Sequence, residues 1–297
     1  MQITANGIKI EVEDTGAPGD GKPVVLLIMG LGMQLIAWPP AIVRAFTESG
    51  YRVIRFDNRD IGLSQWFDHL GRPPMAWLLL KQALGMAIKP GYTLRDMAGD
   101  ALGVLDALQV QRAHVVGVSM GGMIAQRLAL LAPGRVASLV SVMSSSGAPN
   151  LPKPSLALRK ALLSRPKSRD LDAIEAYFLQ VLPMLSGKAH PADLTLLKAG
   201  VRYGLQRSEH QVGTLRQMLA IASDTTRHTE LHRITAPTLV LHGDDDPLVP
   251  YPCGQDTAKR IPGASLHTVA GWGHDFAPSA LPLVIPPMLA HIQKHSA

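Results

Sequence analysis

The sequence has few of the features that mark disulfide-stabilised or nucleic-acid-binding proteins. Its 297 residues include one cysteine, Cys253, so no internal disulfide can form, and we interpret this residue as an inert free thiol. Charged residues make up 18% of the chain and aromatic residues 5%. Although the net charge is +6 and the pI is near 9.5, the basic residues are scattered and seldom accompanied by aromatics. We interpret this balance as a solvated basic surface rather than a nucleic-acid site.

Long uninterrupted apolar runs are also missing. The longest apolar stretch, "VVLLIMGLGMQLIAWPPAIV", approaches membrane length but is broken by Gly30, Gly32, Gln34 and the pair Pro39-Pro40. The N-terminal "MQITANGIKIEVEDTG" lacks the basic-then-apolar layout of a secretory signal, and its Ile8, Ile10 and Val12 alternate as in a strand. We therefore expect a cytoplasmic protein without stable membrane insertion, and leave its oligomeric state open.

What the sequence does contain is a regular alternation of strand and helix patterns, with a chain that is 46% hydrophobic. Helical patterns such as "LRDMAGDALGVLDALQV" and "SALPLVIPPMLAHIQKH" separate short apolar runs. Continuous apolar strands that alternate with helices indicate an α/β fold with a mostly parallel sheet covered on both faces. The predicted strands are "PVVLLIM" (23–29), "YRVIRFD" (51–57), "AHVVGV" (113–118), "RVASLVSVM" (135–143), "APTLVLHG" (236–243) and "GASLHTVAG" (263–271).

Residues 147–232 differ from the remainder of the chain. They open with the linker "GAPNLPKPS" and continue with helical patterns only. We predict a helical cap in this range, inserted into a core formed by residues 1–146 and 233–297. The insertion contains 12 lysines and arginines against 7 aspartates and glutamates, which we interpret as solvated helix faces.

A serine stands between glycines where a predicted strand becomes a helix, in "GVSMGG" (117–122). A sharp turn there lifts the hydroxyl of Ser119 above the sheet edge, and Gly117 and Gly121 allow the flanking elements to approach closely. The N–H of Met120 then points to where an oxyanion could form. The pattern predicts a nucleophilic serine; an ordinary glycine-rich turn is the alternative.

A serine nucleophile needs a base, and the base needs an acid that orients it. In this architecture the chain order is serine, acid, histidine. The turn after the strand at 236–243 offers Asp244, Asp245 and Asp246. Of the histidines that follow, only His274 lies in a glycine-rich loop, "AGWGHDF"; we interpret the earlier His242 as structural.

Together these residues resemble the α/β-hydrolase family over the whole chain. The resemblance is greatest to capped carboxylesterase- and lipase-like members, and the "SMG" elbow also resembles that of aclacinomycin methylesterase and 3-oxoadipate enol-lactonase. The family's G-x-x-D pattern matches Gly243 to Asp246, which implies that Asp246 is the acid and that its two neighbours are solvated turn residues. A D-x-R-x-x-G-x-S segment, from Asp57 to Ser64, implies a structural corner.

One departure from the family concerns the second oxyanion donor. Members usually have His-Gly after the early strand, where this chain has Met29-Gly30-Leu31-Gly32. Because the donor is a backbone N–H, the loss of the histidine side chain need not abolish the hole. The resemblance implies that Leu31 is this donor.

Apolar residues near the predicted site suggest a pocket for an apolar group. Methionine suits a pocket that accepts varied acyl chains, and ordinary core packing is the alternative for each residue. The segment "PMAWLLLKQALGMAI" (74–88) is also unusually apolar. No metal-ligand spacing or dinucleotide motif is visible, so we expect no metal and no cofactor. The candidate pocket residues are Met33, Trp38, Met123, Leu182 and Trp272.

These patterns predict a serine hydrolase that cleaves carboxylic esters of small molecules through an acyl-enzyme. Lactone hydrolysis, C–C bond hydrolysis and cofactor-free perhydrolysis would use the same residues. A ligand-binding protein built on the same scaffold is the non-enzymatic alternative.

Overall fold

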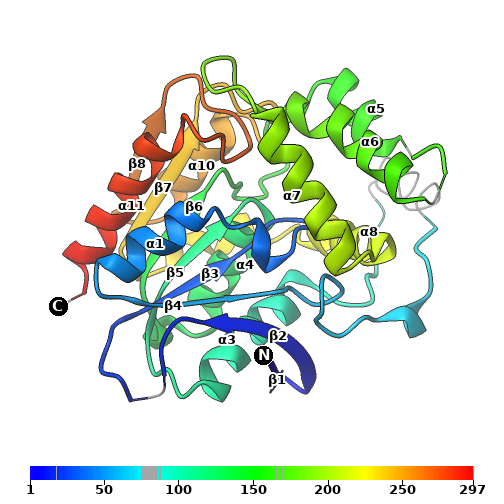
Figure 1. The fold of residues 1–297 in the computed structure, drawn as a ribbon. Coiled ribbons are helices and arrows are strands. Elements are labelled where there is room, and N and C mark those ends of the chain that lie inside the picture. The colour runs from blue at the N-terminus through cyan, green and yellow to red at the C-terminus, as the bar shows by residue number, and fades with distance from the viewer. Residues whose placement is uncertain (18, 75–85, 87, 165, 169, 297) are drawn as a thin grey trace.

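A single mixed sheet forms the centre of the molecule (Figure 1). The computed structural model describes residues 1–17, 19–74, 86, 88–164, 166–168 and 170–296. The apolar segment 74–88 thus lies almost entirely outside the described residues. The strands are β1 (Gln2–Ala5), β2 (Ile8–Asp14), β3 (Val24–Ile28), β4 (Arg52–Phe56), β5 (Ala113–Val118), β6 (Val136–Val142), β7 (Thr238–Gly243) and β8 (Ser265–Val269), in the spatial order β1-β2-β4-β3-β5-β6-β7-β8.

The sheet is parallel from β4 to β8 and antiparallel only at the β1/β2 and β2/β4 pairs. Every residue of β3, β5, β6 and β7 is buried, as expected for parallel strands with helices on both faces. The predicted α/β fold with a mostly parallel sheet is confirmed.

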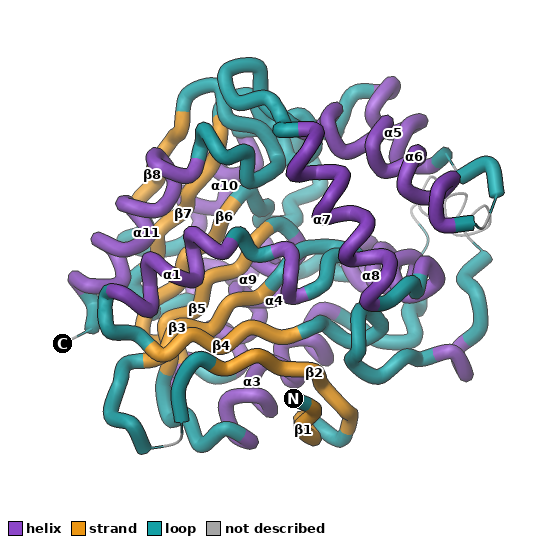
Figure 2. The backbone as a smooth tube through the Cα atoms, viewed as in Figure 1, coloured by secondary structure: helices purple, strands orange, loops and turns teal. Residues whose placement is uncertain are grey.

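Helices cover both faces of the sheet (Figure 2). α3 (Leu94–Ala107) and α4 (Met120–Leu131) contribute to one hydrophobic cluster, and α1 (Pro40–Glu48) and α11 (Leu281–Lys294) contribute to the other. The core also contains α10 (Pro252–Arg260) and the short 3₁₀ helices Leu35–Ala37 (η1), Asp68–Leu70 (η2) and Pro133–Arg135 (η3). The described residues contain no helix long and apolar enough to cross a membrane.

Among the described residues, five α-helices and two 3₁₀ helices lie between β6 and β7. The last two are α9 (Arg227–Glu230) and η5 (Leu231–Arg233), and we call the others the inserted helices. They are α5 (Leu156–Leu163), α6 (Leu171–Val181), η4 (Leu182–Leu185), α7 (Leu194–Arg207) and α8 (Gln211–Ser223). They gather on one side of the molecule, at the upper right of Figure 1. Side chains of Ser155, Asp170 and Asp193 cap the N-termini of α5, α6 and α7, which defines where these helices begin.

The hairpin between β1 and β2 is a feature that the predicted strands did not include. Its turn is Asn6-Gly7, and both residues have positive φ, at 49° and 77°. Such a turn matches the twist of the two strands, and Asn-Gly is its preferred sequence. The dipeptide was therefore a signal from which the hairpin could have been predicted.

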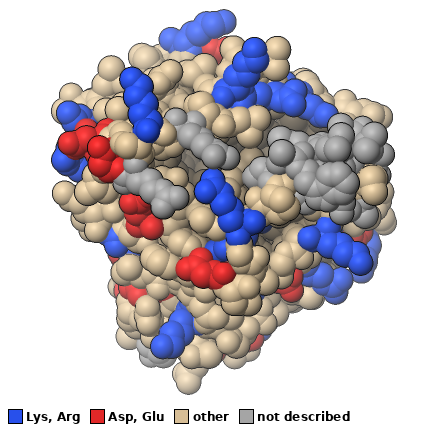
Figure 3. Space-filling view, turned by 90° about the vertical axis from the view of Figure 1, so that its right-hand side faces the viewer, with Lys and Arg blue, Asp and Glu red and all other residues tan. Residues whose placement is uncertain are grey.

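Part of the expectation about basic residues is wrong. Figure 3 shows lysine and arginine side chains spread over one face, with acidic side chains among them. However, the Arg216 and Arg227 side chains of the 147–232 region are only 4% and 1% exposed, and both are in ion pairs. Arg216 pairs with Asp60 of the core, and Arg207 of α7 pairs with Asp57. Arg207 and Arg216 therefore join the inserted helices to the core.

Burial sets the protonation of His114, which lies in β5. Its Nδ1 is 2.8 Å from Ser138 Oγ and its Nε2 is 3.1 Å from Ser296 Oγ. Burial and the nearby charges of His291, Arg112 and His295 lower the pKa of His114 from 6.5 to about 4. Between these values the unfolded chain binds more protons than the folded one, so stability must fall as the pH is lowered from about 6.5 to about 4.

We predict that replacing His114 with leucine flattens this dependence. The free energy of unfolding, measured with urea at pH 7 and pH 5, should fall less towards pH 5 in His114→Leu than in the unchanged chain. The measured quantity is the difference between the two pH values, so a lower stability of the variant at pH 7 does not affect the comparison. An equal difference in both proteins would contradict a buried neutral His114.

Candidate active site

Ser119 occupies a strained turn between β5 and α4. Its backbone has φ 55° and ψ −118°, a conformation unfavourable for a residue with a Cβ. The Ser119 N–H donates to Val142 O at 2.9 Å, and the Ser144 hydroxyl donates to Ser119 O at 2.7 Å. The strand β6 and the residues after it therefore hold the strained peptide in place. Sequence reasoning did not identify Ser144.

Glycines make this turn possible because three backbones meet there. A Cβ on Gly117 would overlap the carbonyl of Gly121, and a Cβ on Gly121 would overlap the Ile28 carbonyl at the end of β3. A Cβ on Gly30 would lie 3.9 Å from Ser119 Oγ. The loop after β3 is therefore a direct neighbour of the serine.

A chain of hydrogen bonds joins Ser119, His274 and Asp246. His274 Nε2 is 2.9 Å from Ser119 Oγ, and His274 Nδ1 is 2.7 Å from Asp246 Oδ2. An ionised carboxylate can only accept, so Nδ1 carries the proton and Nε2 can accept the serine proton. The structure brings together the three residues that the sequence pointed to, from the carboxyl ends of β5, β7 and β8.

The surroundings of Asp246 favour its ionised form. Its Oδ1 accepts the N–H groups of Leu248 at 2.9 Å and Val249 at 2.8 Å. Burial raises the pKa of Asp246, but His274 and His242 lower it by more, so the pKa lies well below its usual range. His242 Nε2 lies 3.5 Å from Asp246 Oδ2 and 2.7 Å from Val249 O. His242 therefore contacts both the carboxylate and the loop that binds it.

Two backbone N–H groups near Ser119 are the candidates for an oxyanion hole. Met120 is the first residue of α4, and Leu31 belongs to the loop beside Ser119. Within the described part of the chain, neither N–H donates to a protein atom. The N-terminus of α4 also carries a partial positive charge. These two groups can therefore donate to a negatively charged oxygen above Ser119.

Asp57 anchors the loop that contains Leu31. Its Oδ1 accepts from the Leu35 N–H at 2.7 Å, and its Oδ2 accepts from the Leu63 N–H at 2.9 Å and from Arg207 at 2.7 Å. Burial raises the pKa of Asp57, and these donors offset part of that rise. Gly62 has φ 61°, and a Cβ there would overlap the Asp57 carboxylate.

The rest of the D-x-R-x-x-G-x-S segment forms a corner of the kind that the sequence pattern implied. Arg59 pairs with Asp100 at 2.6 Å, and Ser64 Oγ donates to Asp57 O at 2.6 Å.

The end of η4 and the segment after it lie directly against the histidine loop. The His274 N–H donates to Leu185 O at 2.7 Å, and the Ala189 N–H donates to Gly271 O at 3.3 Å. A Cβ on Gly187 or Gly273 would overlap the opposite backbone. Backbone groups make most of these contacts, so the sequence held no side-chain signal for them.

The two other aspartates of the 244–246 turn hold backbone groups. Asp244 Oδ1 accepts from the Gly271 N–H at 2.6 Å, and Asp245 Oδ2 accepts from the Lys188 N–H at 2.8 Å. Asp244 is exposed and Asp245 partly so, and neither forms a hydrogen bond with His274 within the described residues. They shape the turn around Asp246.

The predicted pocket residues fall into two groups. Met33 is 40% exposed, Leu182 is partly exposed, and Met123 is 9% exposed in the core cluster beneath the serine. Trp38 and Trp272, in contrast, are fully buried in the cluster beneath α1 and α11, and both contact Phe276. The structure therefore places these two tryptophans in the core instead of at an accessible surface, because large aromatic side chains fill the space between the sheet and its helices.

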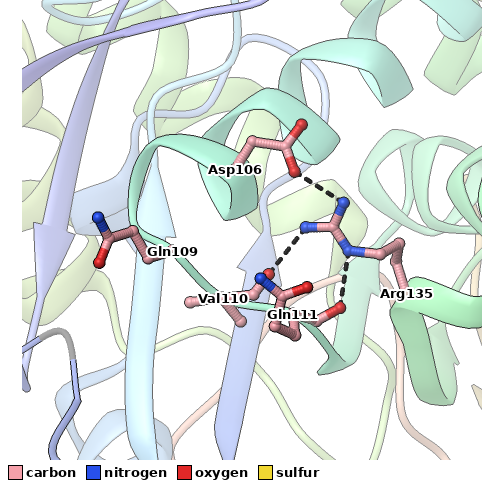
Figure 4. A pocket seen from close by; sticks show the side chains of 5 residues that line it. All are labelled: Asp106, Gln109, Val110, Gln111 and Arg135. Carbon is pink, nitrogen blue, oxygen red and sulfur yellow. Dashed lines mark hydrogen bonds and ion pairs between the residues drawn. The ribbon is translucent and has the colours of Figure 1, made fainter.

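Two cavities in the described structure lie away from Ser119. One, of about 450 Å³, is lined by residues around Asp106, Val110 and Arg135 at the opposite ends of β5 and β6 (Figure 4). The guanidinium of Arg135 is occupied there by Asp106 and by two backbone carbonyls. The other, of about 400 Å³, lies beside β2. We give neither a catalytic role. No group of three or more metal-binding side chains occurs among the described residues.

The chain belongs to the α/β-hydrolase-fold family, whose model matches residues 23–278. Two relatives are the rhodomycin D methylesterases DauP of Streptomyces sp. strain C5 and DnrP of Streptomyces peucetius. Each is 31% identical to this chain, and each alignment covers 99% of this chain and 97% of the relative. The enol-lactonase of Burkholderia xenovorans LB400 has a similar structure, with a TM-score of 0.72, 21% identity and full coverage of both chains. The resemblance to the α/β-hydrolase family is thus confirmed. The similarity to the enol-lactonase structure supports only the fold.

We predict that Gly121→Ala destabilises the protein and removes the reactivity of Ser119, because the new Cβ would push α4 away from β3. The melting temperature and the labelling of Ser119 by a fluorophosphonate would be measured. Gly200→Ala is the matched control, because Gly200 is also helical but has no atom within 4 Å of an added Cβ. Relative to glycine, alanine stabilises a helix interior by roughly 0.5–1 kcal/mol, so the control should melt no lower than the unchanged chain. Equal behaviour of the two variants would contradict the close contact at Gly121.

Proposed function

We propose that this protein is a serine hydrolase that cleaves carboxylic esters. The observation that carries the proposal is the hydrogen-bonded series Ser119–His274–Asp246, near the Leu31 and Met120 N–H groups, which have no partner among the described residues. Membership of the α/β-hydrolase-fold family and the 31% identity to two methylesterases support it.

The geometry suggests a role for each residue. Ser119 Oγ attacks the ester carbonyl while His274 Nε2 takes its proton, and the charged imidazole then protonates the leaving alcohol. Asp246 holds the proton-bearing Nδ1 and stabilises the charge on the ring. The N–H groups of Leu31 and Met120 stabilise the tetrahedral oxyanion. Water, activated by His274, then releases the acid and restores Ser119, without a cofactor.

The inserted helices belong to this proposal as a cap. We divide the chain into a core of residues 1–146 and 233–297 and a cap of residues 147–232. The contacts of Leu185 with His274 and of Arg207 with Asp57 support a position of the cap over the catalytic edge. Exposed or partly exposed apolar residues near this edge, such as Met33 and Leu182, favour an ester with an apolar acyl or alcohol part.

The proposal predicts that Ser119→Ala and Asp246→Asn lower kcat for p-nitrophenyl esters by roughly 10⁴-fold or more, because they remove the nucleophile and the group that orients His274. Both substitutions change few atoms, so the folded state should persist, which circular dichroism would check. Fluorophosphonate labelling should disappear in Ser119→Ala.

Asp245→Asn is the control for the acid, because an asparagine oxygen can still accept the Lys188 N–H. This variant should keep most of the activity. A large loss at Asp245 with none at Asp246 would overturn the assignment of the acid. Product identification on esters, lactones and C–C substrates separates the ester reaction from the others that the same residues could perform. If no substrate turned over and Ser119 took no label, a binding function would be favoured.

A second prediction concerns the apolar pocket. We expect Leu182→Gln to change the relative kcat/KM between short and long acyl chains several-fold, because one buried methylene contributes roughly 0.8 kcal/mol. Leu171→Gln is the control, since Leu171 is 43% exposed at the start of α6. A lower melting temperature with an unchanged chain-length profile would show that Leu182 only packs within the cap.

A further inference from the structure

A buried glutamine on α8 contacts the loop that contains the oxyanion donor. Gln217 is completely buried. Its Oε1 accepts the Gly32 N–H at 2.9 Å, and its Nε2 donates to Arg59 O at 2.9 Å. Because a carbonyl can only accept, the bond to Arg59 fixes which end of the amide is the donor and directs the other end at Gly32.

The Gly32 N–H belongs to the central peptide of a tight turn. The Met33 N–H donates to Gly30 O at 3.3 Å, which closes a four-residue turn over Gly30–Met33. Gly32 has φ +68°, while Leu31 is not among the residues with positive φ. These are the features of a type II turn, in which rotation of the central peptide gives another turn type. The acceptor of Gln217 therefore holds the Leu31–Gly32 peptide in one of its alternative orientations.

The closed turn also sets the direction of the neighbouring Gly30–Leu31 peptide. Its carbonyl is taken by the Met33 N–H inside the turn, so the Leu31 N–H on the opposite side of the same trans peptide points out of the turn. Gly30 itself adjoins Ser119. A second residue of α8 fixes the turn by contact, because a Cβ on Gly32 would lie 2.9 Å from Thr214 Oγ1.

The carbonyl of Arg59 that accepts from Gln217 belongs to a residue held by an ion pair. Its guanidinium binds both carboxylate oxygens of Asp100 at 2.6 Å, and this pair is almost fully buried. Arg59 O is therefore presented from a fixed loop.

We propose that Gln217 is a positioning residue for the oxyanion hole: it fixes the turn that presents the Leu31 N–H to the tetrahedral intermediate. The proposal rests on the proposed ester hydrolysis and adds to it a residue of the inserted helices that acts on the transition state without contacting the substrate.

Gln217→Met tests the proposal, because methionine has a similar length but offers the Gly32 N–H only a weakly accepting sulfur. We expect kcat to fall roughly 10- to 100-fold with little change in KM, since a misplaced donor weakens the transition state more than the bound substrate. The Ki of a trifluoromethyl ketone, which forms a tetrahedral adduct with Ser119, should rise by the factor by which kcat/KM falls. The Ki of an ether of the same chain length, which forms no adduct, should stay the same. End-point titration with a fluorophosphonate counts the active molecules.

Gln217→Glu and Gln126→Met complete the experiment. The glutamate keeps an acceptor for the Gly32 N–H and should recover much of the lost kcat. Gln126 is a second fully buried glutamine. It is hydrogen-bonded to Ser141 and Arg227, whereas Gln217 is bonded to Gly32. Its substitution should lower the melting temperature without a selective loss of ketone affinity.

Equal weakening of the ketone and the ether in Gln217→Met would overturn the proposal, as would an unchanged kcat. If Gln217→Met did not fold, the Gln217→Glu variant would decide. Weaker binding of the ketone alone, in proportion to any fall in kcat, would support the positioning role. Equally weaker binding of the ketone and the ether would overturn it. Failure of the unchanged protein to hydrolyse any ester would instead contradict the proposed function, independently of Gln217.

Discussion

The close approach of α4 to the end of β3 is the constraint on which the rest of the site depends. Ser119 can stand beside the Gly30–Gly32 loop only because Gly121 brings its backbone against the Ile28 carbonyl. Side chains in protein interiors are close-packed, so a single added methyl group at this contact must move a backbone. The same contact brings the N-terminus of α4 next to the loop that contains Leu31.

Charge pairs join the inserted helices to this arrangement. Arg216 binds both oxygens of Asp60 at 2.7 Å. Arg207 binds Asp57, whose carboxylate also accepts the Leu35 N–H at the end of the loop that contains Leu31. Buried ion pairs contribute little net stability, but removal of one partner leaves a buried charge and is destabilising by about 3–5 kcal/mol. Such pairs are thus poor sources of stability and good determinants of where a helix sits. Asp57 and Asp60 both belong to the corner formed by residues 57–64, so these two ion pairs fix α7 and α8 against that corner.

The local pattern of residues was sufficient to predict the parallel strands, the serine turn and the histidine loop. Apolar runs mark strands buried on both faces, and the glycines around Ser119 mark a backbone approach that only they permit. Asp246 could be selected from three adjacent aspartates only through the family resemblance, since the sequence does not show which carboxylate turns towards His274.

Contacts between distant residues were beyond this reasoning. Arg207 and Arg216 look like ordinary exposed helix residues, and their partners Asp57 and Asp60 lie about 150 positions away. The depth of Trp38 and Trp272 likewise depends on how α1 and α11 pack on the sheet. Gln217 carries no signal of its own, because its function depends on a glycine N–H 185 positions away.

The inserted helices hold backbone groups on both sides of Ser119. The Leu185 carbonyl holds the backbone of His274, while Gln217 holds that of Gly32, so both sides of the site depend on segments of this insertion. Any movement that lifted α8 from the core would separate Gln217 from the Gly32 N–H and Arg216 from Asp60 at the same time. The turn around Leu31 would then lose the acceptor that fixes its central peptide, and a buried carboxylate would lose its partner. The turn at Gly32 and the carboxylate of Asp60 therefore depend on the same helix, α8.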